Sequence, residues 1–468
     1  MTTATTDATT ALVEHIGDLD LEALPPAVLT QAKVVLADTV AILLAASLGE
    51  SVRAASTARP LIGDGAATVV GHAITTTPDH AAFINAIGGH DIELDDSHSP
   101  SRTHAASVLV PAALAAAEAA GGATGAAILL GIVAGYDVQV RLSRAIGVQR
   151  QFDHGFHPTS VCGTVGAAVT SGKILGLAPE QLRTCIMLAS SQSSGLMTWQ
   201  DDVTHMVKSF QTGIAARNGL YASLLARNSF GGVGDVLTGR HSMLVAFGGQ
   251  SPEPDQLTAA LRERWDICET SIKRYPCGGQ THAAVAALLD IRESCQLGWA
   301  EIERIDVDLA QGAISIIDNS PLLIANVQYV LALAAHEGSI ERRFFTDPRW
   351  TEDPRIAMTS AKVVVRSNAD IDRTFPAKKG AIVTVTTARG TFRRDLDAPP
   401  GSPWHPLSPA ELKGKFTELA CDVLTEAAAR RLWELLDGFE SVPDTREFFE
   451  IIAAQGGNRR PDVSLDAG

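Results

Sequence analysis

The feature that most constrains the fold is a succession of apolar, helix-length stretches that fills the first half of the chain. These stretches are rich in alanine and glycine, and several are apolar almost all round, which is typical of helices buried in a large bundle. Such small side chains favour close helix–helix packing over a β-sandwich. We expect these helices over residues 27–46, 80–89, 107–120, 124–146, 159–177, 179–196 and 207–226.

The pattern changes near Trp265. Apolar residues then stand mostly two apart over residues 302–309, which predicts a strand, and the segment KVVVR at 362–366 predicts a second. Residues 381–396 have the pattern of a hairpin with a glycine, Gly390, in the turn. A helix is expected among these strands, over residues 281–293.

Helical sequence returns at Ser408, after the proline- and glycine-containing segment 398–404. A chain of 468 residues is long enough for two or three domains. We therefore predict a mostly α protein with an α+β second domain. Residues 1–264 are expected to form the first part of a helical domain, residues 265–400 the α+β domain, and residues 401–468 the helical return.

Composition excludes several kinds of partner. Lys and Arg total 38 against 53 Asp and Glu, so the net charge is −15. A chain this acidic repels phosphate backbones and anionic lipid, and we expect it to bind neither nucleic acid nor membrane. The six cysteines form no CxxC pair, which argues against a zinc ribbon and a disulfide framework. The first residues lack the features of a secretory signal, and a cytoplasmic location is expected.

Motifs for common cofactors are absent at the required spacing. No glycine-rich phosphate loop, dinucleotide-binding motif, zinc-protease motif or serine-hydrolase motif fits the sequence. We expect neither an organic cofactor nor a metal.

The densest polar segment covers residues 90–104 and contains four carboxylates and three histidines. Such a set can cap helices, bind a metal or transfer protons. The Gly88–Gly89 pair before it is expected to end a helix. These side chains would then lie on a loop held by rigid elements, where functional residues are common.

Other candidate residues are dispersed along the chain. His157 stands just before a long helix, whose N-terminus favours a bound carboxylate. Lys208 lies in a helix with small neighbours, where a lysine needs an anionic partner. Residues 272–282 combine two adjacent cations, a glycine pair and a helix start, which together predict an anion-binding turn. Tyr329 has the sequence context of a core tyrosine.

The chain resembles the MmgE/PrpD family in five segments that occur in order: HDIELDDSHSPSRTH, FHPTSVCGTVGAAVTSGKILGL, the lysine before GIAARNGL, IKRYPCGGQTH and NVQYVLALAAHEG. This family includes 2-methylcitrate dehydratases, cis-aconitate decarboxylases and iminodisuccinate epimerases. The resemblance implies a large all-helical domain built from both ends of the chain and a smaller α+β lid domain. It also implies a homodimer, a small carboxylate substrate, and neither metal nor organic cofactor.

The resemblance also assigns residues to the site, in one cleft between the two domains. The family's acidic motif falls on Glu93, Asp95 and Asp96, followed by Ser97. The implied catalytic residues are Glu93, Asp96, His104, His157, Lys208, Lys273 and Tyr329. We expect substrate contacts from Ser97, Thr159, Gly278, Gln280 and His282.

The chemistry that the family shares begins at a carbon next to a carboxylate, where loss of a proton builds an enediolate-like anion. The two lysines are expected to bind the carboxylate in a wet cleft, so that their removal leaves stability unchanged. His104 or His157 is expected to be the base, oriented by Glu93 or Asp96. The helix tyrosine, Tyr329, is expected to be the acid.

A dehydratase of a small di- or tricarboxylate, similar to 2-methylcitrate dehydratase, is the predicted activity. The alternatives are an epimerase of an iminodisuccinate-like dicarboxylate and then a decarboxylase, which ranks third because Gly278 stands where cis-aconitate decarboxylases carry a histidine. A protein that binds carboxylates without catalysis is the alternative from another class.

Overall fold

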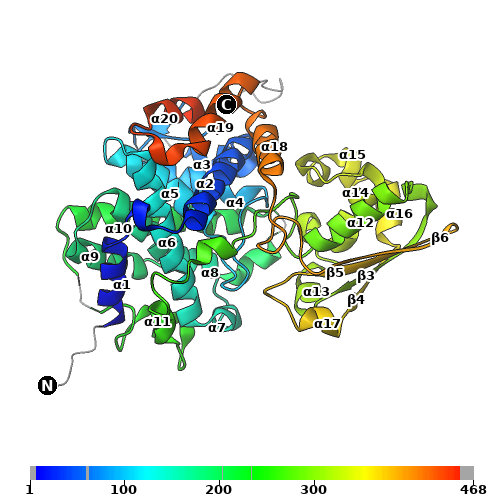
Figure 1. Ribbon diagram of the computed structural model, residues 1–468, viewed down its shortest axis with the longest axis horizontal. Helices are drawn as coiled ribbons and strands as arrows, with labels where there is room; N and C mark the ends of the chain where they lie inside the picture. Colours follow the sequence, from blue (N-terminus) through cyan, green and yellow to red (C-terminus); the bar gives the residue numbers. More distant parts are fainter. Residues whose placement is uncertain (1–6, 59–62, 203, 233–234, 454–468) are drawn as a thin grey trace.

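The computed structural model of the chain describes residues 7–58, 63–202, 204–232 and 235–453. Within these ranges the chain is mostly helical, with two small sheets, and its two parts lie beside each other along the longest axis (Figure 1). One part is built of helices, and the other places helices around a four-stranded sheet. This layout agrees with the predicted mostly α protein with an α+β second domain. The predicted domain boundaries, after residues 264 and 400, remain a prediction.

The helical part contains the first eleven helices and a short antiparallel strand pair. Its elements are α1 (Ala8–Gly17), α2 (Pro26–Ala46), α3 (Glu50–Thr57), β1 (Ala67–Thr68), β2 (Thr75–Thr76), α4 (Pro78–Asp91), α5 (Ala106–Ala119), α6 (Gly125–Ile146), α7 (Val148–Asp153), α8 (Pro158–Ile174), α9 (Pro179–Ser190), α10 (Met206–Arg227) and α11 (Met243–Gly248). The strand pair means that this part is not entirely helical, contrary to expectation.

All seven helices predicted here are present, as α2, α4, α5, α6, α8, α9 and α10. The largest difference at a boundary is at α9, which ends at Ser190 rather than at residue 196.

Glycines bring the central helices of this part into close contact. Helix α8 packs against both α6 and α10. A Cβ atom on Gly219 of α10 would lie 2.5 Å from Ala167 Cβ and 2.6 Å from the Thr164 carbonyl oxygen, both on α8. A Cβ atom on Gly135 of α6 would lie 2.8 Å from the Gly166 carbonyl oxygen. The alanine- and glycine-rich sequence is therefore what allows these backbones to approach so closely.

One expected helix end is wrong. Helix α4 does not end at the Gly88–Gly89 pair but continues to Asp91. The pair serves close packing instead, because a Cβ atom on Gly89 would lie 3.0 Å from the Ser107 carbonyl oxygen of α5. His90 is consequently a helical residue that is fully buried, and the polar loop begins after it.

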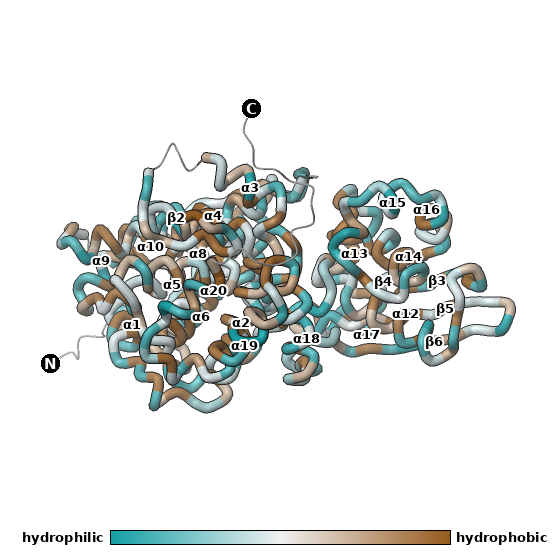
Figure 2. The backbone as a smooth tube through the Cα atoms, turned by 90° about the horizontal axis from the view of Figure 1, so that it is seen from above, coloured by the Kyte–Doolittle hydropathy of each residue, from teal (hydrophilic) through white to brown (hydrophobic). Residues whose placement is uncertain are grey.

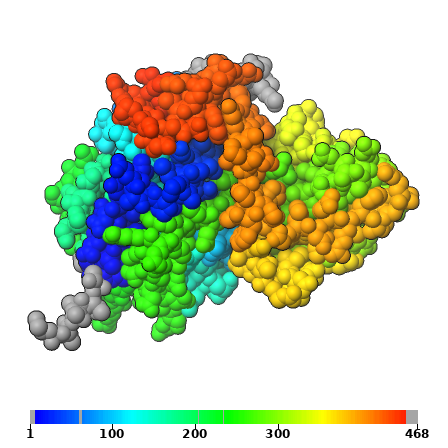
Figure 3. Space-filling model, viewed as in Figure 1, coloured from blue at the N-terminus to red at the C-terminus, as the bar shows by residue number. Residues whose placement is uncertain are grey.

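The last helices are α18 (Pro409–Ala420), α19 (Glu426–Asp437) and α20 (Arg446–Ala453). Helix α18 packs against α2 and lies between the two parts in both views (Figures 1 and 2). The largest apolar cluster has members from Leu12 to Ile272 and again from Phe416 to Ile452. Figure 3 shows these C-terminal helices, in orange and red, against the N-terminal helices in blue.

Two helices of the helical part, α2 and α6, are long and apolar enough to cross a membrane by length and composition alone. Their apolar windows are 67% and 83% buried against the rest of the protein. Such burial is typical of the core helices of a large helical bundle.

The α+β part contains one mixed sheet and six helices. Its elements are α12 (His282–Ser294), β3 (Ile302–Leu309), α13 (Gln311–Ile317), α14 (Val327–Glu337), α15 (Pro348–Thr351), α16 (Pro354–Ser360), β4 (Val363–Ser367), α17 (Ala369–Asp372), β5 (Ala381–Thr387) and β6 (Gly390–Leu396). The strand order is β4-β3-β5-β6, in which β3 and β4 are parallel and the other pairs are antiparallel. The predicted strands, hairpin and helix are confirmed. A second apolar cluster, from Cys277 to Val385, forms the core of this part.

The two crossings between the parts lie side by side. The backbone N–H of Ile272 donates to the Gly401 carbonyl oxygen at 2.8 Å. Gly401 has φ +87°, and a Cβ atom there would lie 1.9 Å from the Ile272 carbonyl oxygen, so the contact requires glycine. This contact fixes where the segment that carries Lys273 enters the α+β part.

The close contact between α8 and α10 gives a stability prediction. Gly219→Ala is expected to lower the free energy of unfolding by about 1–3 kcal/mol, because backbone atoms of α8 leave no space for the added methyl group. Gly414→Ala is the matched control, since Gly414 is exposed on α18 with no atom within 4 Å of its Cβ position. The control should keep its stability or gain about 0.5–1 kcal/mol. Thermal melts of both variants test this, and equal melting temperatures would contradict the prediction.

Candidate active site

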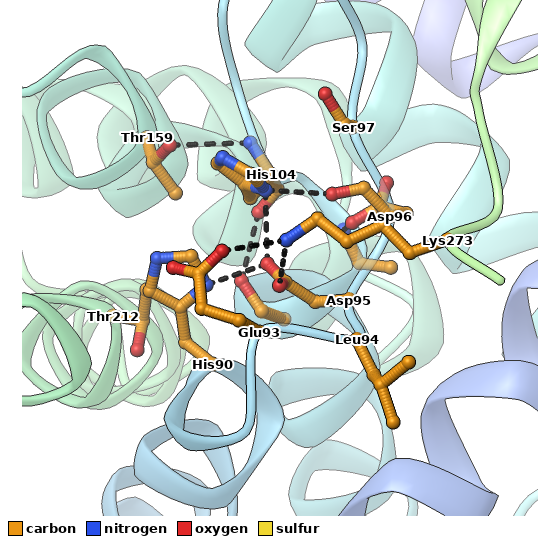
Figure 4. A network of polar contacts seen from close by, with 12 residues as sticks. His90, Glu93, Leu94, Asp95, Asp96, Ser97, His104, Thr159, Thr212 and Lys273 are labelled. Carbon is orange, nitrogen blue, oxygen red and sulfur yellow. Dashed lines mark hydrogen bonds and ion pairs between the residues drawn. The ribbon is translucent and has the colours of Figure 1, made fainter. Parts of the chain in front are cut away.

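A buried ionic network joins the acidic loop between α4 and α5 to α10 and to the first crossing segment (Figure 4). We use the term ionic network for the side chains that share its two central carboxylates. These are His90, Glu93, Asp95, His104, His205, Lys208 and Lys273. The structure therefore brings into direct contact residues as far apart in the sequence as Glu93 and Lys273, which are separated by 180 positions.

Glu93 is held by three basic side chains. Lys208 Nζ donates to Glu93 Oε1, Lys273 Nζ lies 2.8 Å from Oε2, and His205 Nε2 lies 3.0 Å from Oε1. Burial opposes the negative charge of Glu93, but Lys208 and Lys273 outweigh it and hold the pKa of the carboxyl well below its usual range. Glu93 is therefore a fixed anion that pairs with the lysines, and it does not orient His104 as was predicted.

Asp95 is the second carboxylate of the network. Its Oδ2 lies 2.5 Å from His90 Nδ1 and 2.9 Å from His104 Nδ1, and its Oδ1 lies 3.0 Å from Lys273 Nζ. Burial raises the pKa of Asp95, but His90, Lys273 and His104 together hold it well below its usual range. Lys273 thus bridges the two carboxylates.

Asp96 has a structural environment distinct from that of its neighbour. Its side chain accepts hydrogen bonds from the Tyr136 hydroxyl and, at 3.0 Å, from the Ala106 backbone N–H. Burial raises the pKa of this carboxyl to about 7. Only its backbone carbonyl contacts His104, at 2.7 Å from Nδ1. Asp96 therefore contacts His104 as expected, but through its backbone carbonyl, and the carboxylate beside the ring is that of Asp95.

His104 presents one free ring nitrogen. Both acceptors near Nδ1, the Asp96 carbonyl oxygen and the Asp95 carboxylate, require Nδ1 to carry the proton, which leaves Nε2 as the acceptor in the neutral ring. Burial lowers the pKa of His104 although Asp95 opposes the shift. The side chain keeps 20% exposure, against 2% for Asp95, so it is the accessible histidine of the network.

His157 has a similar hydrogen-bond arrangement at its Nδ1 atom. It precedes α8, and its Nδ1 lies 2.8 Å from Gln211 Oε1. The Gln211 amide nitrogen donates to the Leu196 carbonyl oxygen at 2.8 Å, which fixes the orientation of the amide. Burial, with help from His90, lowers the pKa of His157 well below its usual range. His157 is therefore a second neutral imidazole with a free Nε2.

Two residues of the network, His90 and His205, were not singled out by the sequence. The His90 ring centroid lies 4.8 Å from that of His104, 5.9 Å from that of His205 and 6.4 Å from that of His157. Burial lowers the pKa of His90 to about 3. His90 opens the polar segment and His205 precedes Lys208 by three residues, which are the only sequence signals they carry.

The backbone at the network is locally strained. Glu93 has φ +51° and His205 has φ +64°, which are left-handed conformations that non-glycine residues adopt rarely. Such conformations persist where surrounding contacts enforce them, and they cluster at functional sites. The contact between these two side chains thus joins two strained positions.

Two of the expected substrate contacts lie beside the acidic loop. The Thr159 hydroxyl accepts a hydrogen bond from the His104 backbone N–H at 3.1 Å. The Ser97 backbone pairs with that of Ser271, and its hydroxyl lies 3.4 Å from Lys379 Nζ. Thr159 consequently positions the loop, and Ser97 faces the α+β part.

The other three expected substrate contacts lie on the turn that precedes α12. The Gly278 backbone N–H donates to the Ile324 carbonyl oxygen at 2.9 Å. Gln280 has a buried side-chain oxygen without a hydrogen-bond partner. His282 Nε2 lies 3.1 Å from the Cys277 carbonyl oxygen, and burial, followed by the charge of Lys273, lowers its pKa to about 3.

Tyr329 lies in the core of the α+β part. Its hydroxyl donates to the Phe344 carbonyl oxygen at 2.6 Å, and its side chain belongs to the second apolar cluster. Burial raises the pKa of the hydroxyl to about 12. Its role as an acid stays a prediction.

Two sets of side chains among the described residues could offer ligand atoms to a metal ion: His90–Asp95–His104 and His98–Asp266–Glu269. In the first set Lys273 Nζ lies 3.0 Å from Asp95 Oδ1, and in the second Arg144 Nη2 lies 2.9 Å from Asp266 Oδ1. A protein cation already neutralises each carboxylate and would repel a metal ion. Both sets therefore fit ion pairing better than metal binding.

Because Lys208 and Lys273 each pair with a buried carboxylate, replacing either lysine is expected to affect stability. Lys273→Met is expected to lower the free energy of unfolding by about 3–5 kcal/mol, because it leaves the buried Glu93 and Asp95 each without one partner. The earlier expectation of unchanged stability treated the lysines as solvated.

Thermal melts of Lys273→Met at neutral pH test this stability loss. Lys378→Met is the control, since Lys378 pairs with Asp397 at the surface with side-chain exposures of 28% and 58%. The control should change stability by less than about 1 kcal/mol. A Lys273→Met protein that melts with the control would contradict the prediction.

Comparison of the chain with models of known protein families finds two matching domains. The MmgE/PrpD N-terminal domain matches residues 10–255, and the MmgE/PrpD C-terminal domain matches residues 275–440. A cis-aconitate decarboxylase-like protein of Aspergillus oryzae, oryM, is 27% identical over 96% of this chain and 98% of its own length.

Two cis-aconitate decarboxylases are similarly related. That of Aspergillus terreus is 27% identical over 83% of this chain and 84% of its own length. That of Homo sapiens is 26% identical over 79% of this chain and 78% of its own length. Since the two family domains together cover most of its residues, the chain belongs to the MmgE/PrpD family.

Proposed function

We propose that this protein is a lyase that acts on a small di- or tricarboxylate through a carbanion next to a carboxylate. The observation that carries the proposal is the combination, in one network, of lysines fixed by carboxylates and a partly exposed neutral histidine. Its relatives, a cis-aconitate decarboxylase-like protein and cis-aconitate decarboxylases, support a lyase acting on a carboxylate.

His104 is the proposed base. Its free Nε2 can take a proton from the carbon, and Asp95 then lies 2.9 Å from Nδ1 to stabilise the imidazolium that forms. The lowered pKa keeps the ring unprotonated at neutral pH, which is the state that a base requires. The Asp96 carbonyl oxygen maintains the ring orientation.

The lysines are the proposed stabilisers of the anion. An ammonium group has three donors, and the contacts described above occupy two on Lys273 and one on Lys208. The remaining donors can bind the substrate carboxylate as negative charge moves onto it. Because Glu93 and Asp95 hold the ammonium groups in place, little reorganisation is needed during the reaction.

Dehydration is the first specific reaction that we propose. Removal of the proton by His104 would be followed by breakage of the bond to the hydroxyl group, which leaves as water and gives an alkene. Tyr329 and, once its Nε2 has taken up a proton, His157 are the proposed sources of the second proton. Gly278 supports dehydration, since it offers no imidazole at the position where decarboxylases of this family carry one.

Decarboxylation is the second candidate, and the cis-aconitate decarboxylases among the relatives favour it. In that reaction the bond to a carboxylate breaks, CO₂ departs, and the carbon takes a proton that His104 has first taken up from solvent on Nε2. An epimerase would return the proton to the opposite face of the carbon. The homodimer and the cytoplasmic location expected from the sequence stay proposals.

The reaction can be identified with a panel of di- and tricarboxylates in D₂O, followed by NMR. His104→Gln and His157→Gln are each expected to lower alkene formation by roughly 10²- to 10⁴-fold, because each removes an acid/base group. His154→Gln is the control, since His154 is exposed and lies outside the network.

The products of the panel separate the reactions. Alkene with loss of water supports the dehydratase, and release of CO₂ overturns it in favour of the decarboxylase. Deuterium exchange confined to opposite enantiomers in the two variants would support an epimerase. Chemical-shift changes without exchange or product would show a binding protein and overturn the lyase proposal.

Activity is expected without an added metal ion, because protein cations already pair with the carboxylates of both possible ligand sets. Exhaustive dialysis against a chelator followed by the same assay is the measurement. Full activity is the expected result. Activity that disappears and returns with one divalent ion would refute this expectation.

A further inference from the structure

Lys379 is a cation of the α+β part that faces the acidic loop of the helical part. It lies between α17 and β5, and its Nζ is 3.4 Å from the Ser97 hydroxyl. A Cβ atom on Gly279 would lie 3.7 Å from Lys379 Nζ and 4.0 Å from Lys273 Cε. The side chains of Lys379 and Lys273 therefore approach the same glycine, and an added Cβ atom there would be in ordinary van der Waals contact with both.

The charges nearest to Lys379 leave it without an anionic partner. In the ionic network two carboxylates, Glu93 and Asp95, balance two ammonium groups, Lys208 and Lys273. Among the residues that the structure describes, Lys379 forms no ion pair. Lys379 therefore adds a positive charge that neither of the two carboxylates of the network balances.

The groups that act on Lys379 also favour an added anion. Burial, together with the positive charges of Lys273 and Arg102, lowers the pKa of Lys379 to about 8, and Glu93 opposes the shift. Isolated cations away from water are costly unless an anion pairs with them. At neutral pH the lysine is still mostly charged, so an anion bound beside it would remove this cost.

Lys378, the residue before Lys379, has an anionic partner. Lys378 Nζ lies 2.6 Å from Asp397 Oδ2 and 5.5 Å from the Trp404 ring centroid, at the surface of the α+β part. Both side chains are partly exposed, but they face different groups. One is paired at the surface, and the other is unpaired and faces the acidic loop.

We propose that Lys379, with the Ser97 hydroxyl, binds a second carboxylate of the substrate while Lys208 and Lys273 bind the carboxylate next to the reacting carbon. This inference rests on the proposed function and assigns a residue of the α+β part to the recognition of the second carboxylate. The protein selects molecules with at least two carboxylates over monocarboxylates, and the α+β part supplies part of that selectivity.

Calorimetric titration of the full chain tests the assignment, with cis-aconitate, citrate and succinate as probes and butyrate as the monocarboxylate. For a probe with two or more carboxylates, Lys379→Met is expected to raise Kd about 10- to 100-fold, as expected for loss of one charge-assisted hydrogen bond. Butyrate binding should not change between wild type and variant. Lys378→Met should bind every probe as wild type does, and both variants should melt near the wild-type temperature.

A pH series adds a readout that a structural role would not change. The charged or titratable groups acting on Lys379 are Lys273, Arg102, Glu93 and His282. Pairing keeps Lys273 and Glu93 charged, burial keeps His282 neutral, and the Arg102 guanidinium stays charged, so none of them titrates near pH 8. Wild-type affinity should fall as the pH rises through about 8, where Lys379 loses its proton. Lys379→Arg should retain affinity above that pH, because arginine stays charged.

The outcomes separate this inference from the proposed function. Unchanged Kd in Lys379→Met, with turnover by the wild type, overturns the role of Lys379 and leaves the lyase proposal intact. Weakened binding in Lys379→Met, with no turnover by the wild type, supports the role of Lys379 and overturns the lyase. A wild type that binds none of the three probes overturns both.

Discussion

The pairing of two buried carboxylates with cations from distant segments determines how this protein is assembled around its site. Glu93 and Asp95 come from the acidic loop, Lys208 from α10 and Lys273 from the crossing into the α+β part. Removing one member of a buried ion pair costs several kcal/mol, so these segments are stable only together. The apolar clusters stabilise each part, and the ionic network fixes where the crossing segment lies against the helical part.

The same pairing sets the protonation of the groups that can do chemistry. Asp95 and the Asp96 carbonyl oxygen hold the proton of His104 on Nδ1, and Gln211 does the same for His157. Burial keeps both rings neutral. Two free imidazole nitrogens therefore lie beside ammonium groups whose charge is fixed by carboxylates. This combination suits proton transfer next to a carboxylate, because base and cation are both in place before a substrate binds.

Sequence reasoning predicted the elements well because their signals are local. Helical apolar stretches and alternating strands need only neighbouring residues, and the family resemblance brought the histidines and lysines into one site. Errors in prediction arose where one sequence pattern is compatible with two structures. At Gly88–Gly89, for example, glycine can either end a helix or allow close packing within it. Tertiary contacts determine which carboxylates pair with Lys208 and Lys273. They also determine where His205 and Lys379 lie. No motif in the chain encodes them.

The C-terminal helices support the site through one lysine, Lys415. Lys415 of α18 lies 2.6 Å from Asp38 Oδ1 of α2, and it donates to the Leu94 carbonyl oxygen at 3.3 Å across 321 positions of sequence. Burial raises the pKa of Asp38, and the charge of Lys415 opposes that shift. Leu94 stands between Glu93 and Asp95, so this contact holds the backbone from which both carboxylates project. Helices from both ends of the chain therefore position the acidic loop, which makes α18 part of the support of the site.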